Sequence, residues 1–300
     1  MVHEDPRAYL LGLEGLALLR AFTGEFGRDF VAARIAEIRR VLADEALADA
    51  AVDVDRVDTV TGYRLWSATY DRPNSAFDVD EPVVHDIVGA LPAGVALDAA
   101  CGTGRYAAFL AGRGHRVIGV DGSPDMLARA RTRVPGGDFL LGDLHRLPVA
   151  DAGADLVVCG LALTHVPALE PVLAEFARVL RPGGHLVLAD IHPDRVAQGA
   201  VPPVRGADGR PGRLSGHRHP IGDYLRAALA VGLHVRRCEE PLLPDGGPPA
   251  AADPAGTFGP PGPWELWPWS LAALVPEAAR AVASPALVIW HFQAGELTPP

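Results

Sequence analysis

The sequence predicts an α/β protein built on a doubly wound parallel sheet with helices on both faces. Two observations carry this prediction. Between about residues 95 and 190, short apolar runs alternate with amphipathic segments, and a glycine-rich turn joins the first run to the first amphipathic segment. Such a run is typical of a strand buried on both faces, and the segment after it of a crossover helix. Because these crossovers are right-handed, the sheet is expected to be doubly wound.

Composition and charge narrow the class of protein. The chain has 300 residues, of which 49% are hydrophobic and 21% charged, which is enough for one large or two modest globular domains. Its 27 basic and 37 acidic residues give a formal net charge of -10. Nucleic acids and anionic membranes bind basic surfaces, so neither is an expected partner.

Cysteine usage and the N-terminus indicate a cytoplasmic protein. The three cysteines, Cys101, Cys159 and Cys238, include no CxxC pair, which is typical of a reducing compartment. The stretch MVHEDPRAYLLGLEGLALLRAF has no basic n-region, and Glu14 interrupts its apolar run. We therefore expect an amphipathic helix here rather than a signal peptide or a transmembrane span.

Residues 1–75 are expected to be a helical extension or lid, and residues 76–300 the sheet domain. The apolar positions of the extension follow helical spacing, and Gly24 and Gly27 divide it into two helices. The positions predicted to share an apolar face are Leu10, Leu13, Ala17 and Leu18 in the first helix, and Ile35, Ile38 and Leu42 in the second. Two uses of these faces stay open, namely packing on the sheet domain as a cover or forming the seam of a homodimer.

The elements of the sheet domain follow from the same patterns. The predicted strands are Val95–Ala99, Arg116–Val120, Phe139–Leu141, Leu156–Cys159, His185–Asp190, Leu233–Cys238 and Leu287–Phe292. The predicted helices are Tyr106–Arg113, Pro124–Val134, Leu169–Leu180 and Ile221–Gly232. Residues 196–218 and 241–263 are rich in glycine and proline, so we expect flexible loops there, either solvated or forming a flap over a ligand.

The glycine-rich turn indicates a ligand that contains a ribose. Gly102 and Gly104 lack Cβ atoms, so the backbone can turn sharply and a ligand can approach the N-terminus of the next helix. The next strand ends at Asp121, 17 residues after Gly104, where a carboxylate can accept hydrogen bonds from both ribose hydroxyls. Residues 102–107 also satisfy G-x-G-x-x-G/A, so the turn alone leaves both a nucleoside and a dinucleotide such as NAD open.

Several motifs resemble those of the class I S-adenosylmethionine-dependent methyltransferases, from about Asp80 to Phe292. LDAACGTG is similar to the first motif of that family, VIGVDGSPDML to the second and GDLHRLP to the third. DLVVCGLALTHV and EFARVLRPGGHLVLADIHP resemble the segments around the fourth and fifth strands. One departure is Ala100, where many members have glycine. The resemblance implies a Rossmann-like seven-stranded sheet whose last strand, Leu287–Phe292, runs antiparallel beside Leu233–Cys238.

The resemblance also implies S-adenosyl-L-methionine as the cofactor and a small molecule as the methyl acceptor. In this family the glycines accommodate the methionine part, the residue matching Asp121 holds the ribose, and those matching Asp143 and Leu144 meet the adenine. The cofactor contacts implied for this chain are Tyr63, Tyr70, Ala100, Cys101, Gly102, Gly104, Asp121, Gly122, Met126, Asp143, Leu144, Gly160 and Leu161.

Two histidines are candidate catalytic residues. His165 follows the fourth strand, on the loop that in this family faces the methyl group, and its imidazole titrates near neutral pH as a general base should. Capping a helix or only lining the pocket are the alternatives for His165. His192 follows the fifth strand beside Asp190, and a metal site with His165 is the less favoured interpretation, so no metal ligand is assigned.

The acceptor side is less defined by the sequence. Trp264, Trp267 and Trp269 either pack beneath the C-terminal strand or wall an apolar acceptor pocket. His217 and His219 either belong to a solvated loop or contact the acceptor. Three other functions stay open: a protein or peptide methyltransferase, an NAD-dependent oxidoreductase, and a catalytically silent cofactor-binding protein.

Overall fold

The computed structural model describes residues 2–67, 70–71, 75–206, 208–243 and 271–295. The chain divides into two compact units. The sheet unit comprises Thr59–Pro193, Gly216–Leu243 and Pro285–Pro300, and the helical unit comprises Met1–Asp58, Asp194–Ser215 and Pro244–Ser284. In the described part of the chain, no helix combines the length and the apolar character needed to cross a membrane.

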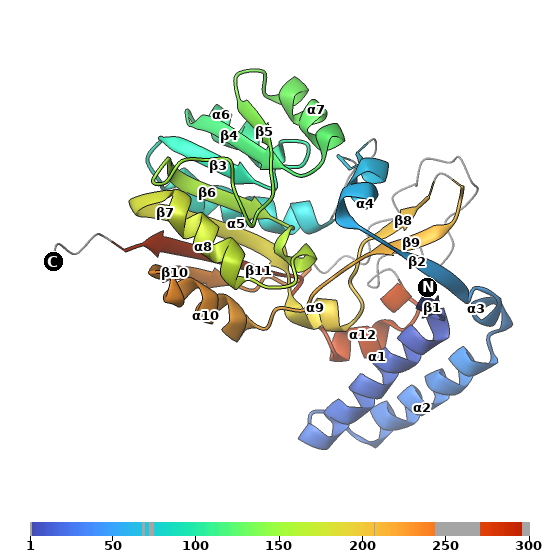
Figure 1. Cartoon of the computed structure of the whole chain (residues 1–300). Helices are drawn as coiled ribbons and strands as arrows, with labels where there is room; N and C mark the ends of the chain where they lie inside the picture. The colour runs from blue at the N-terminus through green and yellow to red at the C-terminus, as the bar shows by residue number, and fades with distance from the viewer. Residues whose placement is uncertain (1, 68–69, 72–74, 207, 244–270, 296–300) are drawn as a thin grey trace. The chain divides into compact units, whose positions relative to one another are not determined.

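The sheet unit contains a seven-stranded sheet with the spatial order β10-β11-β7-β6-β3-β4-β5 (Figure 1). Its strands are β3 (Val95–Ala99), β4 (Arg116–Asp121), β5 (Asp138–Leu141), β6 (Ala154–Gly160), β7 (Leu180–Ile191), β10 (Leu233–Glu239) and β11 (Leu287–Ala294). The strands β3 to β7 run parallel to one another, whereas β11 lies between β7 and β10 and runs antiparallel to both. The predicted fold class and the antiparallel last strand are confirmed.

Helices flank this sheet. They are α4 (Thr59–Trp66), α5 (Ser75–Gly89), α6 (Arg105–Gly112), α7 (Pro124–Arg133), α8 (Glu170–Val179) and α10 (Ile221–Ala230). The apolar positions Val172, Leu173 and Phe176 of α8 share one face at helical spacing and are fully buried, together with α10, against the sheet. α5 packs against β7 and β11. The sequence did not predict α4, which contributes to the wall of the candidate site.

The helical unit contains the two predicted N-terminal helices. They are α1 (Pro6–Arg20) and α2 (Arg28–Ala43), and they pack side by side (Figure 1). A short 3-10 turn, η1 (Ala21–Thr23), separates them, and Gly24 follows it with a left-handed φ of 84° that suits glycine. The helices α3 (Glu45–Asp49), α9 (Pro193–Ala197, with Pro193 in the sheet unit) and α12 (Pro276–Ala281) are further short elements of the chain.

The expectation of a loop without regular elements at residues 196–218 is wrong. Besides the end of α9, this stretch forms β8 (Pro203–Arg205) and β9 (Pro211–Leu214), which join β1 (Val2–Glu4) and β2 (Val52–Val57) in a sheet ordered β1-β2-β9-β8. The glycine that suggested a loop has a packing role here, because a Cβ on Gly212 would lie 2.8 Å from Cγ2 of Val57. Pro203 is the first residue of β8 and Pro211 the first residue of β9, and at the first position of a strand a missing backbone N–H is tolerated.

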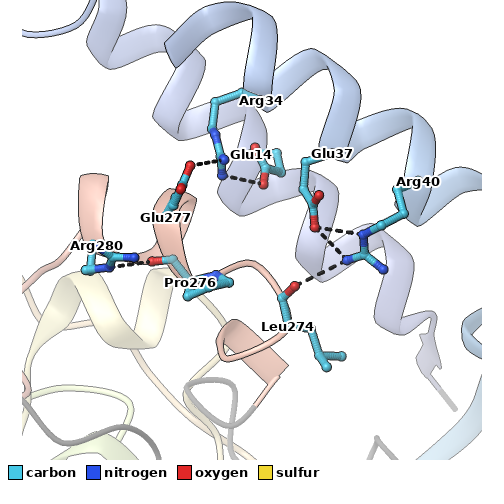
Figure 2. A network of polar contacts seen from close by, with 8 residues as sticks. All are labelled: Glu14, Arg34, Glu37, Arg40, Leu274, Pro276, Glu277 and Arg280. Atoms are coloured by element: carbon cyan, nitrogen blue, oxygen red, sulfur yellow. Dashed lines mark hydrogen bonds and ion pairs between the residues drawn. The ribbon is translucent and has the colours of Figure 1, made fainter. Parts of the chain in front are cut away.

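The prediction of which face of α2 is buried is also wrong. Ile35 is 39% and Leu42 57% exposed, whereas Arg34 and Val41 are buried. The reason is a buried ion pair: Arg34 Nη1 donates to Glu14 Oε1 of α1 at 3.1 Å, and Arg34 Nη2 contacts Glu277 of α12. The spacing of apolar residues cannot predict which face of a helix is buried when the central residue of that face is an arginine. Figure 2 shows Arg34 reaching between the two glutamates.

A second arginine of α2 ties this helix to the segment that precedes α12. Arg40 donates to Glu37 Oε1 at 2.6 Å and to the carbonyl oxygen of Leu274 at 3.2 Å (Figure 2). Burial raises the pKa of the Glu14 carboxyl, and Arg34 opposes that rise. Around these charges pack apolar residues of the three helices and of the segment before α12, namely Leu10, Leu13, Ala17, Val41, Leu271, Ala272, Val275, Ala278 and Ala281.

Two expectations fall outside the described residues. The glycine- and proline-rich stretch 241–263 is described only as far as Leu243. Trp264, Trp267 and Trp269 lie outside the described residues, so both interpretations of this cluster stay predictions.

Candidate functional site

One pocket opens at the carboxyl ends of β3, β4, β5 and β6 in the sheet unit. In open parallel sheets this edge is where ligands bind. The pocket encloses about 910 Å³ of empty space, including its open mouth. Its wall is formed by Thr59, Val60, Tyr63, Tyr70, Ala100, Gly102, Val120, Asp121, Gly122, Ser123, Gly142, Asp143, Leu144, His145, Gly160, Leu161, Ala162, His165 and Val166.

Left-handed backbone shapes two sides of the pocket. Ala100 has a φ of 58° and Gly102 a φ of 53°, in the turn between β3 and α6. Leu161, after β6, has a φ of 56°. A side chain in this region costs on the order of 1 kcal/mol, and such strain is typical of functional sites. The positive φ of Ala100 also explains why glycine would suit this position.

Asp121 stands at the tip of β4 and lines the pocket. Its Oδ2 accepts the Gly102 N–H at 2.8 Å, and its Oδ1 accepts the Ser123 N–H at 2.8 Å. Burial raises the pKa of this carboxyl, and the backbone hydrogen bonds oppose the rise. Each carboxylate oxygen has a second lone pair, so Asp121 can still accept hydrogen bonds from two ligand hydroxyls.

Asp143 follows β5 on another side of the pocket. Its Oδ1 accepts the backbone N–H of His145 at 2.7 Å and lies 2.6 Å from the ring Nδ1 of the same residue. Burial alone would raise the pKa of the Asp143 carboxyl, but the hydrogen bonds from His145 lower it overall. Asp143 is therefore a well-oriented anionic acceptor.

His165 lies at the end of a short 3-10 turn, η2 (Leu163–His165), and lines the pocket. Its Nε2 is 2.9 Å from the hydroxyl oxygen of Tyr63 in α4. The two rings meet edge to face at 5.4 Å, and Tyr63 in turn meets Tyr70 at 5.9 Å. Burial raises the pKa of Tyr63 well above its ordinary value, so this phenol keeps its proton.

The turn that carries His165 is held by two buried side chains. Asp190 accepts the backbone N–H and the hydroxyl of Thr164, each at 2.6 Å. His219 Nε2–H donates to the carbonyl oxygens of Leu163 and Val166, at 3.1 and 2.9 Å. His219 is thus a buried support of the turn and neither a solvated loop residue nor a pocket residue.

His192 is away from the pocket. It is buried, and its Nε2 lies 2.8 Å from Oε1 of Glu240. Its backbone N–H donates to Ala286 at 3.1 Å, which ties the end of β7 to β11. His192 therefore packs beside Glu240 and does not line the pocket with His165. Among the described residues, no group of three or more His, Cys, Asp or Glu side chains could hold a metal ion.

The pocket wall includes eleven of the residues assigned from the sequence, among them His165. The others are Tyr63, Tyr70, Ala100, Gly102, Asp121, Gly122, Asp143, Leu144, Gly160 and Leu161. Cys101, Gly104 and Met126 are not part of it. Cys101 points into the sheet, since a Cβ on Gly119 would lie 3.1 Å from its Sγ, and a Cβ on Gly104 would lie 3.1 Å from Ala130 of α7. Met126 is fully buried in α7, whose N-terminus Ser123 caps.

The sequence reasoning missed eight residues of the wall. They are Thr59, Val60, Val120, Ser123, Gly142, His145, Ala162 and Val166. Ser123, Gly142, His145 and Ala162 directly adjoin assigned positions, so they could have been found by widening each motif by one or two residues. Thr59 and Val60 carry no motif, and only the placement of α4 brings them to the pocket.

Comparisons with known proteins find a methyltransferase domain in this chain. Residues 97–188 match the family described as Methyltransferase domain. The chain is 42% identical over 105 residues to demethylmenaquinone methyltransferase of Beutenbergia cavernae, a match that covers 35% of this chain and 44% of that protein. It is 31% identical over 177 residues to malonyl-[acyl-carrier protein] O-methyltransferase of Yersinia pestis, covering 58% and 62% respectively. The chain thus spans about half the length of the curated relatives it matches.

Solved structures share the fold. An S-adenosylmethionine dependent methyltransferase from Mesorhizobium loti matches with a TM-score of 0.50 and 23% identity, over 71% of this chain and 96% of that chain. The DhpI-SAH complex matches with a TM-score of 0.51 and 19% identity, over 79% and 95%. At these identities the likeness concerns the fold.

Proposed function

Because the chain carries a domain of the class I S-adenosylmethionine-dependent methyltransferases, we propose that it binds S-adenosylmethionine in this pocket and transfers its methyl group to a small molecule. The observation that carries the proposal is the half-buried carboxylate of Asp121, which lines the pocket beside the glycine turn.

The chemistry of the pocket fits this cofactor. Asp121 would hold the ribose through its free lone pairs, and Asp143 would accept from the adenine amino group. The backbone is open at Gly122, where an added Cβ would meet no atom closer than 3.8 Å. The turn from Ala100 to Gly102 would receive the methionine part.

When bound, the cofactor supplies a methyl group that is already activated by the positive sulfonium. The protein therefore acts mainly by positioning the acceptor and by removing a proton where the acceptor has one. Tyr63, which keeps its proton, would donate its hydroxyl to Nε2 of His165, and that nitrogen could then accept the phenol proton. We propose that the acceptor proton moves to the Tyr63 oxygen while the phenol proton moves to His165, which leaves Tyr63 neutral.

The wall of the pocket supports a largely apolar acceptor. Val60 and Val166 lie on the same wall as Tyr63 and His165. Burying apolar surface against such side chains favours an acceptor with hydrocarbon or aromatic character. The names of the two relatives, a demethylmenaquinone methyltransferase and a malonyl-[acyl-carrier protein] O-methyltransferase, cover different acceptors, so they support methyl transfer and leave the acceptor open.

The function is tested with S-adenosylmethionine labelled in its methyl group and a panel of small-molecule acceptors. We expect label in a small-molecule product. Label in protein or peptide only would favour a peptide methyltransferase, and no label despite cofactor binding would favour a silent binder. For His165→Gln, we expect turnover to fall by about 100-fold or more with unchanged affinity for S-adenosylhomocysteine, because a general base acts on the proton-transfer step. Unchanged turnover would remove His165 from this role.

We also propose a cytoplasmic location. Cys101, Cys159 and Cys238 are free thiols. Free thiols persist where the surroundings are reducing. Fractionation of cells that produce the tagged chain tests this proposal, and recovery outside the cytoplasm would contradict it.

A further inference from the structure

We propose that Asp71, Thr103 and Arg133 form a clamp that fastens the turn after α4 to the glycine turn, and that Asp71 thereby positions Tyr70 over the bound cofactor. We call these three residues the Asp71 clamp. The inference rests on the proposed function, since it concerns how the same pocket is closed. It assigns a positioning role to residues that do not line the pocket themselves.

The three side chains close a ring of polar contacts. The Thr103 hydroxyl donates to Asp71 Oδ1 at 2.6 Å. Arg133 Nη2 lies 2.7 Å from Asp71 Oδ2, and Arg133 Nη1 donates to the Thr103 hydroxyl oxygen at 3.0 Å. Each member therefore contacts both of the others. Thr103 belongs to the glycine turn, Arg133 ends α7, and Asp71 follows α4, so the clamp joins three segments that are distant in sequence.

Burial separates this clamp from an ordinary surface ion pair. Thr103 is only 1% exposed, so its hydroxyl needs an acceptor inside the protein, and Asp71 supplies it. The side chains of Arg133 and Asp71 are 31% and 38% exposed. A lone exposed pair contributes little, whereas a shared network with a buried member and a charge-assisted hydrogen bond holds its geometry.

The position of Tyr70 follows from that of its neighbour Asp71. A Cβ on Gly102 would lie 3.8 Å from Cε1 of Tyr70, so this ring is next to the glycine turn, and both residues line the pocket. Tyr70 also meets Tyr63 and Trp66 of α4, at 5.9 and 6.1 Å between ring centroids. Tyr63 in turn contacts His165. The clamp thus fixes one end of an aromatic row whose other end is the candidate base.

A second tie secures the chain beyond this turn. Arg105, the first residue of α6, pairs with Asp80 at 2.7 Å and with Glu81 at 3.1 Å. Its guanidinium also lies over the ring of Phe77, 4.2 Å from the centroid, and Phe77 meets Tyr70 at 5.5 Å. α5 is therefore held independently of Asp71, which means that loss of the clamp should release α4 and Tyr70 without detaching α5.

The test compares Asp71→Asn with Asp138→Asn, using calorimetry with S-adenosylhomocysteine. Asp138 is a matched control, because it also pairs with one arginine, Arg116, at 3.1 Å, but both are exposed and Arg116 stands at the opposite, amino-terminal end of β4. For Asp71→Asn we expect affinity to fall about ten-fold, the change that loss of one hydrogen bond to a charged group produces. We expect the fall to appear as faster dissociation and as faster amide hydrogen exchange in α4 of the bound protein, with thermal stability of the free protein like that of the control.

Arg133→Gln and the double variant Asp71→Asn/Arg133→Gln complete a double-mutant cycle. If the clamp acts as one unit, the double variant binds no more weakly than Asp71→Asn alone. Equal affinity and equal α4 exchange for Asp71→Asn and Asp138→Asn would overturn the clamp. Failure of the unmodified protein to bind S-adenosylhomocysteine would instead overturn the proposed function, so the two failures are distinguishable.

Discussion

Between the seven-stranded sheet and α8 and α10 the packed side chains are apolar, whereas the helices of the other unit bury Glu14 and Arg34 among leucines and alanines. In the sheet unit, the buried Asp98 and Asp190 and the half-buried Asp121 lie near the carboxyl ends of their strands, and the buried Asp80 of α5 pairs with Arg105. Buried charge therefore has two meanings in this chain. In the sheet unit most of the buried carboxylates lie near strand ends, whereas in the helical unit the buried charges join α1, α2 and α12.

The largest expected effect tests the buried pair directly. Arg34→Met should lower the free energy of unfolding by about 3–5 kcal/mol, because Glu14 would be left buried without its cation. Denaturant unfolding followed by far-UV circular dichroism measures this change. Arg39→Met, at an exposed position of the same helix, is the control and should stay within about 0.5 kcal/mol. If the two variants lose equal stability, charge is not part of this core. Adding Glu14→Leu to Arg34→Met should restore much of the loss.

The next effect concerns a carboxyl of the sheet unit. Burial raises the pKa of Asp98 from 3.8 to about 7, while a hydrogen bond from the Ala107 N–H, at 2.8 Å, opposes the rise. Between these values the folded protein keeps a proton that the unfolded chain has lost. The contribution of the Asp98 proton to the free energy of unfolding is therefore complete below about pH 4, and it is lost as the pH rises through about 7.

Asp98→Asn keeps an acceptor oxygen for Ala107 but cannot titrate. The stability of the unmodified protein relative to this variant should fall from pH 4 to pH 7, by about 3 kcal/mol. Urea unfolding at a series of pH values measures the difference. Parallel curves for the two proteins would mean that Asp98 has an ordinary pKa.

A smaller change in stability is expected from the left-handed residue Ala100 at the pocket. Ala100→Gly should raise the free energy of unfolding by about 0.5–1 kcal/mol, because Ala100 has a φ of 58° and glycine relieves that strain. Ala99→Gly, one residue earlier in β3, should destabilise instead, since a strand interior disfavours glycine. Thermal unfolding of both variants is the measurement. A lower melting temperature for Ala100→Gly would show that the strain is compensated elsewhere.

The smallest effect is expected on the outer face of α2. Leu42→Gln should change stability by no more than about 0.5 kcal/mol, because Leu42 is exposed. Val41→Ala, its neighbour on the buried face, should cost roughly 2 kcal/mol. Denaturant midpoints compare them. A larger loss of stability for Leu42→Gln than for Val41→Ala would show that the face predicted from the sequence is the buried one.

The same contrast explains what the sequence could predict. Strands such as β3 and β11 were predictable because their burial is apolar and local. Asp121 was predictable because it ends a strand of a recognisable unit. The inward turn of Arg34 depends on Glu14 and Glu277, which no local pattern connects. Likewise, only the folded chain shows that Gly212 makes room for Val57 in a strand pair.

The site divides in the same way. Positions that follow a strand, such as Asp143 and His165, could be expected on the pocket wall because strand ends of a parallel sheet converge. Met126 was expected near the ligand, but Ser123 caps α7 and Met126 packs into the core. The support that His219 gives to the His165 turn joins residues more than fifty positions apart. Such tertiary pairs carry no signal in a single sequence.

The central claim is that the pocket at the strand ends binds S-adenosylmethionine through Asp121. Calorimetric titration with S-adenosylhomocysteine and, separately, with NAD(H) tests it most directly, on the unmodified protein and on Asp121→Asn. We predict binding of S-adenosylhomocysteine alone, weakened about 100-fold or more in the variant, because a charged acceptor facing two hydroxyls is lost. Binding of NAD(H) alone, or equal affinity of the variant for S-adenosylhomocysteine, would contradict the account.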